Sequence, residues 1–349
     1  LYECELTANQ KELTEEYKEE LKTIQIENAK SYYTKQDALC KTDIFKYMGD
    51  YMKHSKEEYI GIFREQADKI FADLLKSKLS LNSKASEMNK RIKSFKEIQF
   101  SKILQVSKSE NWSTETLLNE LLLLTYSSYI VMLEFRNDIW LYEYMSFARR
   151  IGELWEPFCK LPFYYPIKKL NLIEPPEFSI IQQKIQSDAN NFIDTLNLDD
   201  KIKRELKQKY EIPWTMVDSG GINLNLDLHF EQNGIHYNCD FKSGFSSNEK
   251  GNTNRLLLVA SIFNYLGKNE KQIIFVRQKE SENNHYLQTL KNSKYWTVYC
   301  SDDCYKATKE FTGFDLRNWL NENAQWQDDI SEGFRKHLEH NDLLKYLTW

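Results

Sequence analysis

The sequence predicts a mixed α/β protein, in which a large helical domain precedes a sheet flanked by helices. Residues 1–156 contain no proline and have apolar residues at three- and four-residue spacing, which is the periodicity of helices that bury one face. Five prolines then lie within residues 157–176. Beyond them, stretches of alternating polar and apolar residues indicate strands with one buried face, and apolar helices separate these strands.

Length and composition describe an ordered globular protein with room for two domains. Of 349 residues, 41% are hydrophobic, and the formal net charge of −5 provides no global basic field for a nucleic acid. Six irregularly spaced cysteines do not form a disulfide scaffold and favour a reduced, cytoplasmic setting. The longest apolar run, residues 121–133, falls short of the about 20 residues of a membrane span, so we expect a buried core helix of a soluble protein.

The first domain is predicted to span residues 1–170 and the second residues 171–349. Proline has no amide hydrogen and ends helices, so the proline cluster is the expected boundary or linker. In the second domain, the strand after the hairpin and its following helix is expected to run parallel to the last hairpin strand. The predicted bounds are 178–196 and 198–210 for two helices, 212–217 for a first strand, 253–266 for the helix after the hairpin, and 272–276 and 296–300 for the last strands.

The hairpin is the clearest element, because residues 221–244 alternate between apolar and polar types around Asn233-Gly234. This dipeptide favours a type I′ turn, which needs positive φ at both central positions. Gln232 then pairs with Ile235, and every later pair follows from that register. The predicted apolar face carries Leu226, Leu228, Phe230, Tyr237, Cys239 and Phe241. The predicted polar face carries Asn225, Asp227, His229, Asn238, Asp240 and Lys242.

On the polar face, the register places Asp227 directly opposite Asp240. Like charges at such a position are destabilising, by up to about 3 kcal/mol at an effective dielectric constant near 20. A proton on one carboxylate, or partial neutralisation by Lys242, would reduce this repulsion. A divalent cation between them would reduce it more, since Mg²⁺ prefers carboxylate, carbonyl and water oxygens.

These residues match a known signature. Asp227, followed on the adjacent strand by Asp240-Phe241-Lys242, resembles the PD-(D/E)XK motif of the restriction endonuclease-like nuclease superfamily. The expected order of elements in residues 178–300 is similar to the core of that superfamily, while the helical domain has no counterpart in it. Leu226 stands where the proline of the motif would be, a position at which family members often lack proline.

The resemblance implies metal-assisted hydrolysis of phosphodiester bonds. Asp227 and Asp240 would hold one or two Mg²⁺ ions, with the backbone carbonyl of Phe241 as a further ligand. Lys242 would orient or help to deprotonate the attacking water and stabilise the charge of the phosphorane. Glu205, on the helix before the hairpin, is the candidate for the additional acid that some family members use.

The loop after the hairpin leads into a helix that we expect Asn252 or Thr253 to cap. A helix N-terminus next to a phosphate-cleaving site is a natural anion contact. His229 is expected to be a solvated strand residue. The candidate DNA contacts are Asn225, Ser243, Lys250, Asn252 and Arg255.

We therefore expect a Mg²⁺-dependent endonuclease that cuts double-stranded DNA and is most like a type II restriction endonuclease of a prokaryotic cytoplasm. The helical domain would then recognise DNA, form a homodimer, or do both. A nuclease of the same superfamily that acts in repair, in recombination or on RNA would have the same site. A non-catalytic nucleic-acid-binding protein, or a hairpin whose polar face only meets water, are the alternatives without catalysis.

Overall fold

The computed structural model describes residues 53–215, 223–267 and 269–349, with the backbone alone for residues 213–215. Residues 54–349 form one compact unit. The helical character expected for residues 1–52 and the turn expected at residues 219–221 lie outside the described residues.

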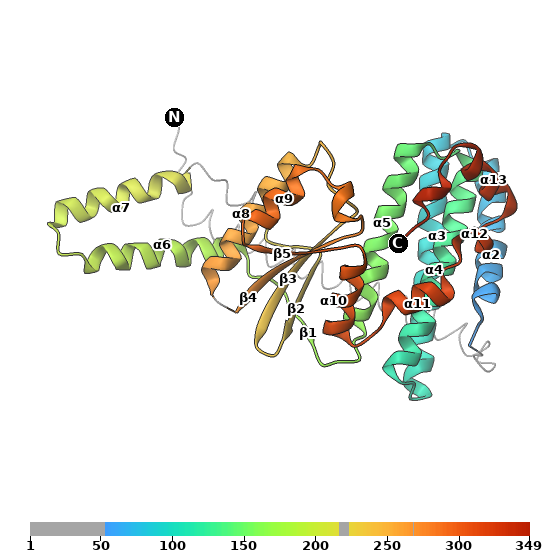
Figure 1. Cartoon of the computed structure of the whole chain (residues 1–349), viewed down its shortest axis with the longest axis horizontal. Coiled ribbons are helices and arrows are strands. Elements are labelled where there is room, and N and C mark those ends of the chain that lie inside the picture. The colour runs from blue at the N-terminus through green and yellow to red at the C-terminus, as the bar shows by residue number, and fades with distance from the viewer. Residues whose placement is uncertain (1–52, 216–222, 268) are drawn as a thin grey trace, which may run out of the picture. The chain divides into compact units, whose positions relative to one another are not determined.

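Four long helices make up the helical part of this unit (Figure 1): α2 (Lys56–Lys76), α3 (Leu81–Ser109), α4 (Thr114–Ile139) and α5 (Tyr144–Tyr164). The first three begin at serine N-caps whose hydroxyls accept a hydrogen bond from a backbone amide three residues later. Helix α4 packs against the other three helices. Among the described helices, α4 alone is long and apolar enough to cross a membrane. However, 78% of its apolar 18-residue stretch is buried inside the fold. This agrees with the expected core helix.

The predicted end of the helical part at the proline cluster is wrong in one respect, because Pro157 and Pro162 lie inside α5. Ten residues of this helix are buried, and the burial of so much apolar surface offsets the hydrogen bonds that two prolines remove. The chain leaves the helical conformation only after Tyr164.

A five-stranded mixed sheet follows (Figure 1). The strands lie in chain order: β1 (Asn171–Leu172), β2 (Leu228–Gln232), β3 (Ile235–Lys242), β4 (Glu270–Val276) and β5 (Trp296–Cys300). The first three are antiparallel, and β4 and β5 run parallel to β3. The predicted α/β class and the parallel strand after the hairpin are confirmed.

The hairpin has the predicted turn and register over its regular part. Asn233 and Gly234 have φ of 56° and 76°, and Gln232 pairs with Ile235. The ladder ends at Leu228, opposite Cys239, so the predicted pairs of residues 225–227 with residues 240–242 do not form. Leu226 was predicted on the same face as Leu228. It lies instead on the other face of the sheet, in the hydrophobic cluster between the sheet and the helices that cover that face.

Helices cover both faces of the sheet. The hydrophobic cluster on one face draws on α6 (Phe178–Thr195), α8 (Lys250–Leu266) and α9 (His285–Asn292). On the other face, aromatic rings of α5 and α10 (Asp302–Thr312) pack against β2, β3 and β4. His229, Asn238 and Asp240 of the predicted polar face are therefore buried, while Asp227 and Lys242 are partly exposed at the end of the hairpin.

Two predicted elements differ in their bounds. Residues 212–215 belong to α7 (Asp200–Thr215) and not to a strand, and β1 provides the antiparallel neighbour of β2 in place of the predicted strand. Helix α8 begins at Lys250, after Glu249 at the N-cap position, so neither Asn252 nor Thr253 caps it. The polar residues of 250–255 are compatible with a helix interior, and the predicted start was three residues too late.

The C-terminal helices α11 (Leu316–Asn323), α12 (Trp326–Asp329) and α13 (Glu332–His340) return to the helical part. Lys56 forms a 2.8 Å ion pair with Asp329, and the amide of Ser331 donates a hydrogen bond to Glu134. The division into domains at residue 170 stays a prediction. Two short 3₁₀ segments, Glu280–Glu282 and Leu344–Tyr346, complete the fold.

Candidate functional site

The candidate site lies where β3 extends beyond its partner β2. Because β2 begins at Leu228, the last three residues of β3 pair only with β4. Asp227 occupies the open side of this overhang, where its Oδ2 accepts a 2.7 Å hydrogen bond from the backbone amide of Phe241. The amide and carbonyl of one strand residue point to the same side, so the Phe241 carbonyl also points toward the open edge. The sequence elements of the signature therefore meet at one place.

Asp240 is the most unusual residue of this site. It is only 1% exposed, and its Oδ2 lies 2.6 Å from Nζ of Lys242, while its Oδ1 lies 3.7 Å from Nη2 of Arg255. Burial raises the pKa of Asp240 to about 6, the positive charge of Lys242 opposes the increase, and the charge of Asp227 adds to it. Perturbed carboxylates of this kind concentrate at functional sites.

Two contacts fix the backbone next to Asp227. Lys160 of α5, itself 2.8 Å from Glu156, donates a 3.0 Å hydrogen bond to the Asp227 carbonyl. Nε2 of His229 accepts a 2.9 Å hydrogen bond from the amide of Leu226. These two hydrogen bonds hold the backbone of the turn that carries the Asp227 carboxylate.

His229 is a buried structural residue, and the expectation of a solvated strand residue is wrong. It is 7% exposed because the helices of that face cover the hairpin. Since Nε2 accepts from Leu226, Nδ1 carries the proton and donates to Oδ1 of Asn238 at 2.7 Å. Burial lowers the pKa of His229, which favours this neutral form. Asn238 in turn donates to Glu270 at 2.7 Å.

The donor set at the overhang fits a hard cation such as Mg²⁺. The described part of the chain contains no group of three or more His, Cys, Asp or Glu side chains suited to a metal. Two carboxylates and one carbonyl still supply three oxygens, and Mg²⁺ commonly binds one or two carboxylates while keeping water and substrate oxygens as its other ligands. The Oδ2 atom of Asp240 is buried and has the Lys242 ammonium at 2.6 Å as its described partner, and a carboxylate oxygen has a further lone pair for a cation.

The remaining predicted residues lie at different distances from this centre. Arg255 reaches Asp240 from the first turns of α8. Lys250 is exposed at the start of the same helix, and Asn252 donates to Glu249 at 2.9 Å. Asn225 is exposed just before Asp227. Glu205 is exposed on α7, a helix whose main contacts are with α6, and no described contact joins it to Asp240.

Ser243 has a packing role that the sequence did not predict. Its hydroxyl accepts a 3.0 Å hydrogen bond from Nε of Arg277. A Cβ atom on Gly152 of α5 would lie 2.6 Å from the Ser243 side chain, so the backbone of α5 packs directly on it. Lys160 and His229 were also missed as supports of Asp227. Lys160 contacts Asp227 across the fold, and His229 contacts Leu226 around a turn, so no local pattern predicts either contact. The only sequence signal was the alternation that placed His229 on the polar face of the hairpin.

The arrangement can bind a cation and hold a lysine ammonium next to it. No protein-family model, no curated protein and no solved structure matches this chain. The geometry and electrostatics of the overhang are therefore the only indications of function.

Proposed function

We propose that this protein is a Mg²⁺-dependent endonuclease that hydrolyses phosphodiester bonds of double-stranded DNA, with a restriction endonuclease-like core and sequence-specific cleavage. The observation that carries the proposal is the nearly inaccessible carboxylate of Asp240, which lies between Lys242 and Asp227 at the open edge of β3. A buried carboxylate with a raised pKa costs folding free energy. A role of Asp240 in holding a metal ion for an anionic substrate would explain why the fold retains this costly carboxylate.

Each residue of the site has a distinct role in this proposal. Asp227 and Asp240, with the Phe241 carbonyl, hold the metal, and Mg²⁺ supplies Lewis acidity and a more acidic bound water. Lys242 keeps the Asp240 carboxylate ionised and presents its ammonium to the non-bridging oxygens of the phosphate. Arg255 adds a second positive charge above Asp240 and orients the backbone of the substrate.

Several observations support this reading over a merely solvated hairpin. Helices cover both faces of the hairpin around Asp240, so this carboxylate is removed from bulk water, while Asp227 stays partly exposed at the open edge. Lys242 and Arg255 lie 2.6 Å and 3.7 Å from the Asp240 carboxylate, and Lys160 donates to the backbone carbonyl of Asp227. A purely structural sheet edge would gain more from apolar residues at these positions than from a buried charged pair.

The test is cleavage of plasmid and phage DNA of known sequence, in buffer with Mg²⁺ at about 10 mM or with EDTA. The proteins are the wild type, Asp240→Ala, Lys242→Ala and the matched surface variant Asp68→Asn, whose side chain is exposed on α2. Both site variants should lose about a hundred- to a thousandfold in rate, as loss of a charge-stabilising group typically causes. Asp68→Asn should cut as the wild type does.

The products identify the kind of nuclease. Discrete fragments that require Mg²⁺ support a sequence-specific endonuclease. A smear, nicking, or cleavage of RNA or branched DNA instead supports a nuclease of the same chemistry with another substrate. If DNA, RNA and branched substrates all remain intact under these conditions, and the metal does not bind, the catalytic proposal is wrong and a non-catalytic binding protein remains.

A further inference from the structure

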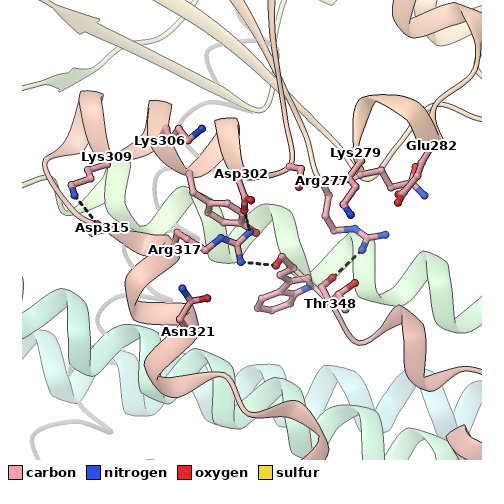
Figure 2. A pocket seen from close by; sticks show the side chains of 14 residues that line it. Arg277, Lys279, Glu282, Asp302, Lys306, Lys309, Asp315, Arg317, Asn321 and Thr348 are labelled. Carbon is pink, nitrogen blue, oxygen red and sulfur yellow. Dashed lines mark hydrogen bonds and ion pairs between the residues drawn. The ribbon is translucent and has the colours of Figure 1, made fainter.

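A second candidate site lies at the carboxyl ends of the parallel strands β4 and β5. A cavity of about 850 Å³ opens there, between the segments that follow these two strands and helices α10 and α11. Figure 2 shows Arg277, Lys279 and Glu282 on one wall and Lys306 and Lys309 of α10 on the opposite wall. The carboxyl ends of parallel strands are where α/β proteins bind ligands.

This cavity is distinct from the Asp240 site. Val276 and Asp240 share the face of the sheet that α8 covers, because Val276 belongs to the α8 cluster and its neighbour Ile274 pairs with Asp240. The next residue, Arg277, points to the α5 face, where its Nε donates to Ser243. The two sites therefore flank the same strand ends from opposite faces of the sheet.

The cavity carries an excess of positive charge. Five of its lining residues are basic (Arg277, Lys279, Lys306, Lys309 and Arg317), and three are acidic (Glu282, Asp302 and Asp315). Lys309 pairs with Asp315 at 2.7 Å, Arg317 pairs with Asp302 at 2.9 Å, and Lys306 pairs with Asp303 at 2.9 Å. Within the described ranges, Arg277 and Lys279 have no carboxylate within ion-pair distance.

Arg277 is the strongest anion contact of the cavity. It is half-buried, and burial lowers its pKa because desolvation penalises the guanidinium charge. Nε donates to Ser243 and Nη1 to the carbonyl of Thr348, both at 3.0 Å (Figure 2 draws the second bond). These two bonds hold the side chain in place, and its Nη2 makes no hydrogen bond to any residue that the structure describes. A fixed guanidinium with spare donors suits a phosphate group.

We propose that this cavity binds the phosphate group of a nucleotide, either free or within a nucleic-acid strand, with Arg277 and Lys279 as its anion contacts. A volume of about 850 Å³ lies within the usual range for sites that enclose a small ligand. Binding at this cavity does not depend on cleavage at Asp240, so each proposal stands or fails separately.

The test measures binding in EDTA, so that no cleavage occurs. The probes are fluorescently labelled ATP and a labelled single-stranded oligonucleotide, each titrated with the full-length protein while fluorescence anisotropy is recorded. The variants are Arg277→Gln, Lys279→Gln and the matched control Lys306→Gln, which removes one charge from a paired, exposed lysine that lines the same cavity. Thermal unfolding of each variant shows whether it is folded.

Arg277→Gln should weaken binding about tenfold or more, as loss of a charge-assisted hydrogen bond does. Lys279→Gln should weaken it severalfold, and it decides the matter if Arg277→Gln does not fold, because Lys279 is exposed. Loss of ATP binding would identify a free nucleotide as the ligand, and loss of oligonucleotide binding alone would identify a strand. Absence of binding to both probes, or equal weakening by Lys306→Gln, would overturn the proposal.

Discussion

Replacing Asp240 with asparagine should stabilise the metal-free protein relative to the wild type, and the gain should grow as the pH rises. Asp240 is 1% exposed, and burial raises its pKa from 3.8 to about 6 despite the ion pair with Lys242. A carboxyl with a higher pKa in the folded state binds more protons when folded. Its contribution to stability is therefore least unfavourable in acid and worsens as the pH rises from about 4 to about 6.

The size of the effect follows from the shift. A difference of roughly two pKa units corresponds to about 3 kcal/mol between the fully protonated and the fully ionised carboxyl. About 2 kcal/mol of this falls between pH 4.5 and pH 7.5, because the unfolded carboxyl already begins to titrate near pH 4. Asparagine has nearly the same shape and no charge, so the variant lacks this pH dependence.

Urea unfolding of both proteins in EDTA, at pH 4.5 and pH 7.5, measures the effect. The free energy of unfolding of Asp240→Asn minus that of the wild type should be about 2 kcal/mol larger at pH 7.5 than at pH 4.5. Addition of Mg²⁺ at pH 7.5 should reverse the order when its concentration is a thousand times its Kd, since it then stabilises the wild type by about 4.1 kcal/mol and the variant much less. A difference that is the same at both pH values would refute the burial argument.

Three further changes test the supports of the site and the fold. His229→Phe removes the acceptor for the Leu226 amide and should weaken Mg²⁺ binding about tenfold in a calorimetric titration, as loss of a residue that orients a ligand does. Gly152→Ala should destabilise the protein by about 1–3 kcal/mol in thermal unfolding, because the added Cβ lies 2.6 Å from the Ser243 side chain. Gly61→Ala is the control: its added Cβ has no neighbour within 4 Å, and it should stabilise α2 by up to about 1 kcal/mol. Glu134→Gln should cost about 2 kcal/mol in urea unfolding, since it breaks a bidentate pair with the half-exposed Arg64.

The parts of the fold that local chemistry controls were predictable. The Asn233-Gly234 turn determines the register of the hairpin, and alternation determines which residues share a face. The strand at residues 296–300 and the helix beginning at Phe178 were also predicted at their observed positions.

The other features depend on tertiary packing, which no local pattern encodes. The ladder ends at Leu228 because His229 binds the Leu226 amide and turns the chain. Pro157 and Pro162 remain helical because α5 is buried between the sheet and the other helices. The raised pKa of Asp240 likewise needs α8 above it, and the sequence indicated only the like charge of Asp227 and the apolar character of that helix.

The central claim is that the overhang of β3 binds a divalent cation, and titration calorimetry tests it without knowledge of the substrate. Mg²⁺ and, separately, Mn²⁺ are titrated into the wild type, Asp227→Asn, Asp240→Asn and the control Asp68→Asn at pH 7.5. The predicted result is saturable binding to the wild type and to Asp68→Asn, and at least about a tenfold loss of affinity in each site variant. Absence of binding to the wild type, or equal binding by all four proteins, would contradict the assignment of the site.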